Sequence, residues 1–127
     1  MIVGLGIDVF DVARMAADLH KADPGFLPRI FTDDEIDHGM RQRVPAEHFA
    51  ARFAAKEAVA KALAIGDDLT PCWTDIDVGG RRGAEPQVEL RGRIGELAER
   101  RGVTRIRLSL ARTRGVVVAS AILESTP

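Results

Sequence analysis

The stretch from Ala46 to Ala64 constrains the fold more than any other part of this chain. It is rich in alanine and free of glycine and proline, and Pro45 before it suits the first turn of a helix. Gly66-Asp67-Asp68 should end that helix. On a helical wheel Phe49 and Leu63 share an apolar arc, whereas the rear face carries small alanines that let other elements approach closely. The sequence therefore predicts a long helix at the centre of the fold.

Shorter elements flank this helix on both sides. Hydrophobic alternation predicts strands, apolar positions three and four apart predict helices, and Thr32 with Glu35 forms a capping-box pattern. We expect strands at 2–7, 73–78, 87–90, 105–110 and 116–123, and helices at 9–19, 32–39, 46–64 and around 94–98, the last stopping at Gly102. We expect the final strand to be buried on both faces, because it is almost wholly apolar. The order β-α-α-α-β-β-α-β-β indicates one α+β domain over residues 1–127.

Composition excludes several classes of function. The formal net charge of −1 and the pI of about 6.3 give no global attraction to nucleic acid or to a membrane surface. Five Phe, one Trp and no Tyr argue against an aromatic platform for single-stranded nucleic acid. A single cysteine, Cys72, excludes an internal disulfide and a multi-cysteine zinc site. The N-terminus lacks the pattern of a signal peptide, so we expect a cytoplasmic protein with no nucleic-acid or membrane partner.

The central helix carries charges on or beside its apolar surface. Lys56 falls inside the apolar arc and Glu57 at its edge. A buried charge needs a partner or a ligand, which is the functional interpretation. The structural alternative is an ion pair, since Glu57 and Lys61 have the favourable i, i+4 order. Helix geometry alone does not favour either interpretation.

Asp8 is the second candidate, and it should lie where the first strand ends and the first helix begins. Taken alone, such an Asp is most simply an N-cap. The functional alternative is a metal ligand, because Mg²⁺ is commonly held by one or two carboxylates, waters and substrate phosphates. Asp8 and Glu57 would suffice if the fold brings them together.

Other polar residues carry weaker signals. The three histidines lack metal-ligand spacing and should lie at the surface, and Cys72 should be a half-buried, inert thiol. Basic residues gather around the first helix, where a solvated face is the simpler interpretation and a docking patch the alternative. The basic residues of this patch are Arg14, Lys21 and Arg29. The three histidines are His20, His38 and His48.

Together these residues resemble the holo-[acyl-carrier-protein] synthases. The similarity starts with Gly4-Leu5-Gly6-Ile7-Asp8-Val9 and continues with Phe26-Leu27-Pro28-Arg29-Ile30-Phe31-Thr32. Its most specific part is Arg52-Phe53-Ala54-Ala55-Lys56-Glu57-Ala58 with Lys61-Ala62-Leu63. Trp73 to Val78, Pro86 and the final strand from Val116 to Glu124 also match, so the resemblance covers nearly the whole chain in order.

The resemblance implies a fold and a reaction. The fold is that of the 4'-phosphopantetheinyl transferases, α+β with an antiparallel-rich sheet wrapped around a long central helix. Small members form homotrimers with active sites between subunits. The reaction transfers 4'-phosphopantetheine from coenzyme A to a serine of an apo acyl carrier protein, with Mg²⁺, and releases adenosine 3',5'-bisphosphate. The carrier, from fatty-acid, polyketide or another pathway, is left open.

The resemblance also implies residue roles. Asp8 and Glu57 match the Mg²⁺ carboxylates, and Lys61 matches a catalytic lysine that contacts the phosphates of coenzyme A. The proton acceptor for the serine is Glu57 or a metal-held water. Further expected coenzyme A contacts are Arg52, Lys56, Gly66, Arg112 and Thr113, and expected carrier-docking residues are Arg14, Lys21 and Arg29.

Two departures from the family pattern define the alternative. The family usually has Gly-Thr-Gly after the central helix, where this chain has Ala64-Ile65-Gly66. Arg112 stands where a histidine is common, and arginine is also a good phosphate ligand. The alternative function is a carrier-protein-binding paralogue that has lost or changed the transfer activity.

Overall fold

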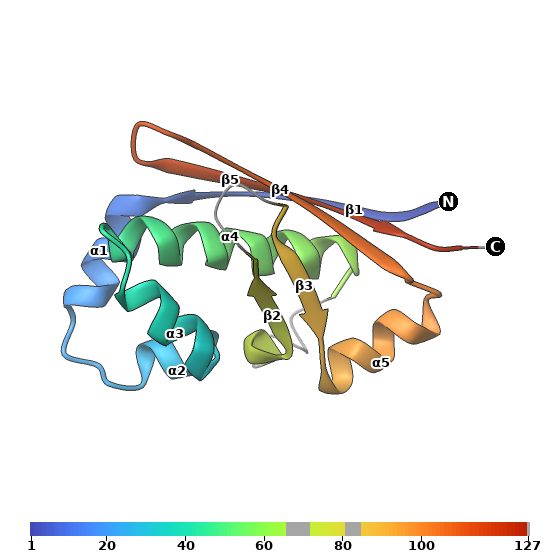
Figure 1. The fold of residues 1–127 in the computed structure, drawn as a ribbon, viewed down its shortest axis with the longest axis horizontal. Helices are drawn as coiled ribbons and strands as arrows, with labels where there is room; N and C mark the ends of the chain where they lie inside the picture. The colour runs from blue at the N-terminus through green and yellow to red at the C-terminus, as the bar shows by residue number, and fades with distance from the viewer. Residues whose placement is uncertain (66–71, 81–84, 127) are drawn as a thin grey trace.

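A computed structural model describes residues 1–65, 72–80 and 85–126, and its layout follows the long central helix (Figure 1). Strand β1 (Ile2–Asp11) leads into α1 (Val12–His20), α2 (Phe26–Ile30), α3 (Asp33–Met40) and the central α4 (Pro45–Ala62). Strands β2 (Ile76–Gly79) and β3 (Gln87–Leu90), helix α5 (Gly92–Arg100), and strands β4 (Arg105–Thr113) and β5 (Val116–Glu124) complete the chain. Within these ranges no helix combines the length and apolar character needed to cross a membrane.

The main sheet is antiparallel in the order β1-β5-β4, and it lies along one side of α4 (Figure 1). Strands β2 and β3 form a separate antiparallel pair, which lies with α2, α3 and α5 on the side of α4 opposite the main sheet (Figure 1). Most of α4 is buried, including Phe49, Val59 and all but one of its alanines at or below 8% exposure. The predicted α+β architecture around a central helix is confirmed.

The first strand is longer than expected. Residues Asp8 to Asp11 pair with Ala119 to Val116 of β5, so β1 continues four residues past Ile7. Helix α1 begins at Val12, and its N-cap is Asp11, whose side chain accepts a hydrogen bond from the Ala13 N–H. The expectation that Asp8 lies at the strand–helix junction was therefore wrong, and the simple capping role for Asp8 falls with it.

Three further expectations need correction. Helix α2 was not predicted, since five residues are too few to show helical periodicity. The strand expected at 73–78 is confined to Ile76–Gly79, because residues 72–75 form a 3₁₀ turn, in which the Trp73 carbonyl accepts a hydrogen bond from Lys56. Strand β5 alternates between buried and half-buried residues, so only the face toward α4 is fully covered. The capping box at Thr32 and Glu35 is confirmed.

Candidate active site

Two glycines let β1 lie directly on the backbone of α4. A Cβ at Gly4 would overlap the Ala62 carbonyl oxygen, and a Cβ at Gly6 would overlap the Ala58 carbonyl oxygen. The contact leaves no room for a side chain, so the strand backbone approaches the helix closely. Asp8, two residues beyond Gly6 and on the same face of β1, is thereby brought to the last turns of α4.

Asp8, Glu57 and Lys61 gather at this contact. Lys61 Nζ donates hydrogen bonds to Asp8 Oδ1 at 2.9 Å and to the Ile7 carbonyl at 3.1 Å. Partial burial raises the pKa of Glu57, the nearby Asp8 carboxylate raises this pKa further, and Lys61 lowers it. The fold thus joins two carboxylates and one lysine from distant parts of the sequence, and the group retains an excess of negative charge.

The donor set of this group suits a hard divalent cation. Asp8 and Glu57 are oxygen ligands, and their mutual repulsion is what a bound cation would relieve. In the described part of the chain no cluster of three or more His, Cys, Asp or Glu side chains could form a complete protein cage for a metal. Two half-buried carboxylates fit Mg²⁺, which is commonly held by one or two carboxylates together with waters and substrate phosphates.

Lys56, five positions before Lys61 on α4, has a different environment. Its side chain is 0% exposed, and Nζ donates to Glu35 Oε1 at 2.8 Å and to the carbonyls of Trp73 and Ile76 at 3.1 and 2.5 Å. Glu35 Oε2 accepts from the Val78 N–H at 2.9 Å. All three Nζ hydrogens are used, so any role of Lys56 at a coenzyme A site acts through the elements that it joins. Sequence analysis assigned Glu35 only to the capping box and missed this partner.

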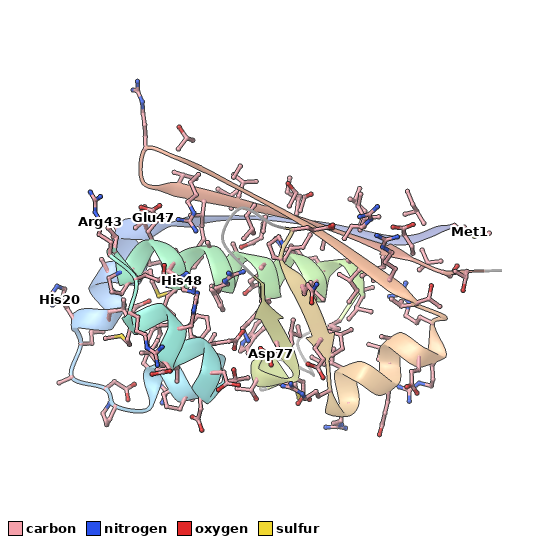
Figure 2. All side chains as sticks on the ribbon, viewed as in Figure 1. Met1, His20, Arg43, Glu47, His48 and Asp77 are labelled. Atoms are coloured by element: carbon pink, nitrogen blue, oxygen red, sulfur yellow. The ribbon has the colours of Figure 1, made fainter. Side chains whose placement is uncertain are left out.

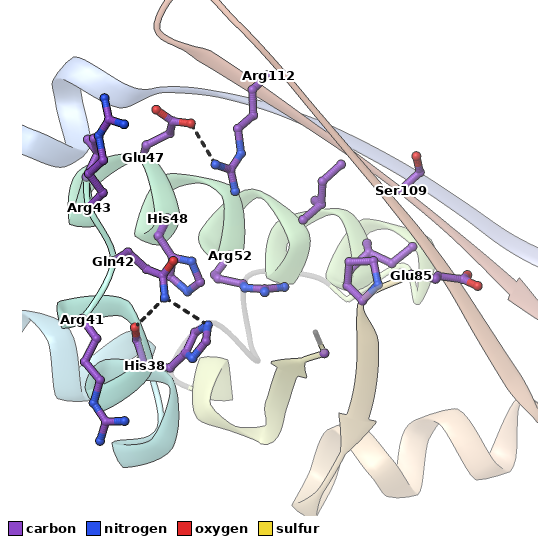
Figure 3. Close-up of a pocket in the computed structure, with 15 residues that line it drawn as sticks. His38, Arg41, Gln42, Arg43, Glu47, His48, Arg52, Glu85, Ser109 and Arg112 are labelled. Atoms are coloured by element: carbon purple, nitrogen blue, oxygen red, sulfur yellow. Dashed lines mark hydrogen bonds and ion pairs between the residues drawn. The ribbon is translucent and has the colours of Figure 1, made fainter. Parts of the chain in front are cut away.

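A cavity of about 1350 Å³ lies between α3, the first half of α4, β4 and the residues before β3 (Figure 3). Its lining is rich in basic side chains, including Arg52 of α4 and Arg112 of β4. Arg112 donates to Glu47 Oε1 at 2.8 Å. Arg52 Nη1 is buried and has no hydrogen-bond partner among the described residues. A guanidinium with one buried, unsatisfied nitrogen at the wall of a cavity is well suited to bind an anion.

The histidines do not all lie at the surface. His20 is exposed at the outer end of α1, whereas His48 is 7% exposed and lines the cavity (Figures 2 and 3). The expectation for His48 was wrong, because its ring packs against His38 of α3 and against Phe49. Arg41 and Arg43 also line the cavity and were missed. The sequence signal that could have identified them is the basic segment Arg41-Gln42-Arg43 before the central helix.

The other candidate residues are placed more loosely. Arg14 is exposed and lies over the Phe10 ring, with its guanidinium carbon 5.5 Å from the ring centroid. Lys21 pairs with Asp18 and Arg29 pairs with Asp23, both at the surface. Thr113 is exposed at the end of β4, Cys72 is half-buried as expected, and Gly66 lies outside the described residues.

Comparisons with known proteins show which family the chain belongs to. A family model described as the 4'-phosphopantetheinyl transferase superfamily matches residues 4–119. The chain is 40% identical over 124 residues to the holo-[acyl-carrier-protein] synthase of Koribacter versatilis, covering 98% of this chain and 99% of that protein.

Two solved structures extend the similarity to the fold. The holo-[acyl-carrier-protein] synthase of Neisseria meningitidis has a TM-score of 0.87 and 29% identity, covering 98% of this chain and 100% of that one. The synthase of Bacillus anthracis in complex with CoA (3',5'-ADP) has a TM-score of 0.76 and 29% identity, with 99% of each chain covered. The chain therefore belongs to the 4'-phosphopantetheinyl transferase superfamily and, within it, to the holo-[acyl-carrier-protein] synthases.

Proposed function

We propose that this protein transfers 4'-phosphopantetheine from coenzyme A to a serine of an apo acyl carrier protein, with Mg²⁺ bound at Asp8 and Glu57. The observation that carries the proposal is the group of Asp8, Glu57 and Lys61, assembled by the contact of β1 with α4 in a chain of this family. Released adenosine 3',5'-bisphosphate is the second product.

The residues of the group have distinct tasks in this reaction. The serine oxygen forms a bond to the phosphorus that bears the pantetheine arm, and the bond from that phosphorus to the nucleotide phosphate oxygen breaks. Lys61 Nζ, half-exposed and reaching Asp8, supplies a compact positive charge for the phosphate oxygens. Bound Mg²⁺ supplies further neutralisation of the pyrophosphate charge. The serine proton passes to Glu57 or to a water beside it, and the raised pKa of Glu57 suits a proton acceptor.

The nucleotide end of coenzyme A fits the basic cavity. Arg52 and Lys61 are nine positions apart on α4, so they point about 180° apart and lie about 13 Å apart along the helix axis. A single chain thus presents the cavity and the carboxylate group on different sides of α4. We therefore propose that coenzyme A binds to Arg52, Arg112 and Thr113 of one copy and to the carboxylate group of another copy, whose Gly66 follows the Lys61 end of α4 in the sequence.

This division needs at least two copies of the chain, and we propose the homotrimer with active sites between subunits that the family resemblance implies. The outer face of β1 supports it, because Leu5, Ile7 and Val9 are 69%, 59% and 61% exposed. Apolar side chains aligned on one face of a strand are typical of a surface that another chain covers. A monomer found by light scattering would contradict this assembly.

The carrier protein is proposed to dock beside α1. Acyl carrier proteins are acidic, and Arg14 is exposed with no carboxylate within ion-pair distance in the described ranges. Lys21 and Arg29 extend the basic surface, although each already has an acidic neighbour. We also propose a cytoplasmic location for the enzyme.

The turn after α4 favours an active enzyme over a paralogue without transfer activity. Ala64 has φ +55, the left-handed conformation that glycine adopts easily. The Ile65 N–H bonds to the Ala60 carbonyl and the Ala64 N–H to the Lys61 carbonyl, which is the Schellman pattern. The backbone thus takes a glycine-type conformation at Ala64 without the glycine.

The test is the intact mass of an apo acyl carrier protein incubated with this protein, coenzyme A and Mg²⁺. We expect a gain equal to one phosphopantetheine group, abolished by EDTA and restored by excess Mg²⁺. A carrier whose acceptor serine is replaced by alanine serves as the matched control. No gain with several carriers, while the folded protein still binds them, would support the paralogue instead.

A further inference from the structure

The basic cavity contains two histidines in contact with each other. His38 of α3 and His48 of α4 have ring centroids 5.1 Å apart (Figure 3). His38 is exposed, and Gln42 Nε2 lies 3.3 Å from its Nε2 and donates to its carbonyl at 3.1 Å. His48 is enclosed and also packs against Phe49, with centroids 5.9 Å apart. Neither histidine has a role in the chemistry described so far.

The charged groups around His48 are mostly positive. The two acidic residues of the lining are already paired: Glu47 with Arg112 at 2.8 Å, and Glu85 with Arg107 at 3.0 Å. The remaining charged groups of the cavity are basic. They are Arg41 and Arg43 from the segment between α3 and α4, Arg52 from α4, and His38 from α3, and of these Arg41 forms an ion pair with Asp37 of α3.

The surroundings of His48 favour its uncharged form near neutral pH when the cavity holds no anion. Burial lowers its pKa to about 4, and the positive charges of Arg52, His38 and Arg112 contribute in the same direction. An entering dianion would compensate those charges and replace water as a partner of the ring. Protonated imidazole would then be favoured, because an opposite charge at contact distance stabilises the charged form.

We propose that His48 is a proton-linked ligand of the phosphomonoester of coenzyme A, taking up a proton from solvent when that group enters the cavity. The inference rests on the proposed function. With the pyrophosphate at Asp8, Glu57 and Lys61, the cavity is left for the third phosphate of coenzyme A. That phosphate is a monoester with a pKa of about 6, so it is mainly a dianion at neutral pH.

The sign of proton exchange separates this proposal from a cavity that uses arginines alone. Arginines favour the dianion and lower the pKa of the phosphate, so binding to them alone releases protons. A histidine that becomes charged takes protons up. The part of the affinity for coenzyme A that depends on His48 should therefore rise as the pH falls from about 8 toward 7, where the phosphate is still largely a dianion.

The experiment is calorimetric titration of the full-length protein with coenzyme A, in the absence of a carrier protein, near pH 7 and in two buffers of different ionisation enthalpy. We expect net uptake on the order of 0.5 proton per site. Dephospho-coenzyme A, which lacks the monoester, should bind without this uptake. The variant His48→Gln should lose the uptake and bind several-fold more weakly, while the matched His20→Gln keeps both.

Net release, zero exchange, or uptake that persists in His48→Gln and disappears in His38→Gln would each overturn the role of His48. If His48→Gln does not fold, the imidazole ¹⁵N shifts of the wild-type protein give the answer: the His48 ring must become doubly protonated when the ligand binds. Coenzyme A that binds and is consumed without proton uptake defeats only this inference. Failure of both ligands to bind defeats the proposed function as well.

Discussion

Two lysine–carboxylate pairs on α4 have similar geometry and opposite surroundings. Lys56 Nζ and Glu35 Oε1 are 2.8 Å apart, and the side chains are 0% and 4% exposed. Lys61 Nζ and Asp8 Oδ1 are 2.9 Å apart, and the side chains are 53% and 13% exposed. The two lysines are five positions apart on the same helix. Because the two ion-pair distances are almost equal, they do not distinguish the roles of the pairs.

The difference lies in how far each pair is satisfied. Lys56 and Glu35 use their hydrogen-bonding groups within the protein, tying α3 and β2 to α4. We call Lys56 and Glu35 the inner pair. Lys61 and Asp8 are the outer pair, and together with Glu57 they form the outer group. The raised pKa of Glu57 reflects burial and the repulsion from Asp8. A saturated pair stabilises one arrangement of the chain, whereas an unbalanced and accessible group is available for a ligand.

Removing a carboxylate of the outer group should have the largest effect. Asp8→Asn or Glu57→Gln should lower the rate of transfer to the carrier by about 10³-fold or more, because a metal ligand and its charge neutralisation are lost. The rate is read from the carrier's intact mass over time. Glu99→Gln, a like change at an exposed residue of α5, is the control. Wild-type rates in both Asp8→Asn and Glu57→Gln would refute the assignment.

Breaking the inner pair should act on stability instead. Lys56→Met leaves Glu35 buried without its cation and should cost about 3 kcal/mol or more of unfolding free energy, measured by urea denaturation. The double variant Lys56→Met/Glu35→Gln should recover part of the loss. Lys21→Met, at an exposed pair, should change stability by less than about 1 kcal/mol. Equal effects of the two single lysine variants would remove the contrast.

A glycine at position 64 should stabilise the turn that follows α4. Ala64→Gly relieves the left-handed conformation at φ +55 and should raise the unfolding free energy by about 0.5 to 1 kcal/mol. Ala22→Gly, in the exposed segment after α1, is a control with no such strain to relieve. A decrease in stability for Ala64→Gly would show that the left-handed turn is not formed in solution.

The smallest expected effect is on the metal-free protein. The pKa of Glu57 is raised in the folded state, so its favourable contribution is present below the unfolded pKa and is lost as the pH rises through the folded pKa. Near pH 7 without Mg²⁺, Glu57→Gln should therefore raise the melting temperature by about 1 to 2 °C, a small shift because solvent screens a half-exposed carboxylate. Calorimetry at about pH 4 and pH 7 should show the gain only at the higher pH.

Local patterns predicted much of the fold but few of its long-range contacts. The alanine-rich segment indicated a central helix, and the wheel position of Lys56 indicated a buried charge; both are confirmed. The partner of Lys56 was missed because Glu35 also satisfies a local capping box. Helix periodicity describes one face of one element and contains no information about which distant side chain meets it.

The outer group shows the same limit. Its residues were candidates from the sequence, yet their meeting depends on β1 continuing past Ile7 and on the overlap that only Gly4 and Gly6 avoid. The basic cavity was missed, because it forms where α3, α4 and β4 converge and because His48 was expected at the surface. Both the outer group and the basic cavity depend on contacts between distant elements, which the propensities of single segments do not predict.

Binding of coenzyme A with and without Mg²⁺, compared between the wild type and Asp8→Asn, tests the role of the outer group most directly. We predict that Mg²⁺ tightens binding to the wild type by about tenfold or more and leaves binding to Asp8→Asn nearly unchanged. Equal affinity of the wild type with Mg²⁺ and with EDTA would contradict the claim that Asp8, Glu57 and Lys61 hold the metal and the phosphates.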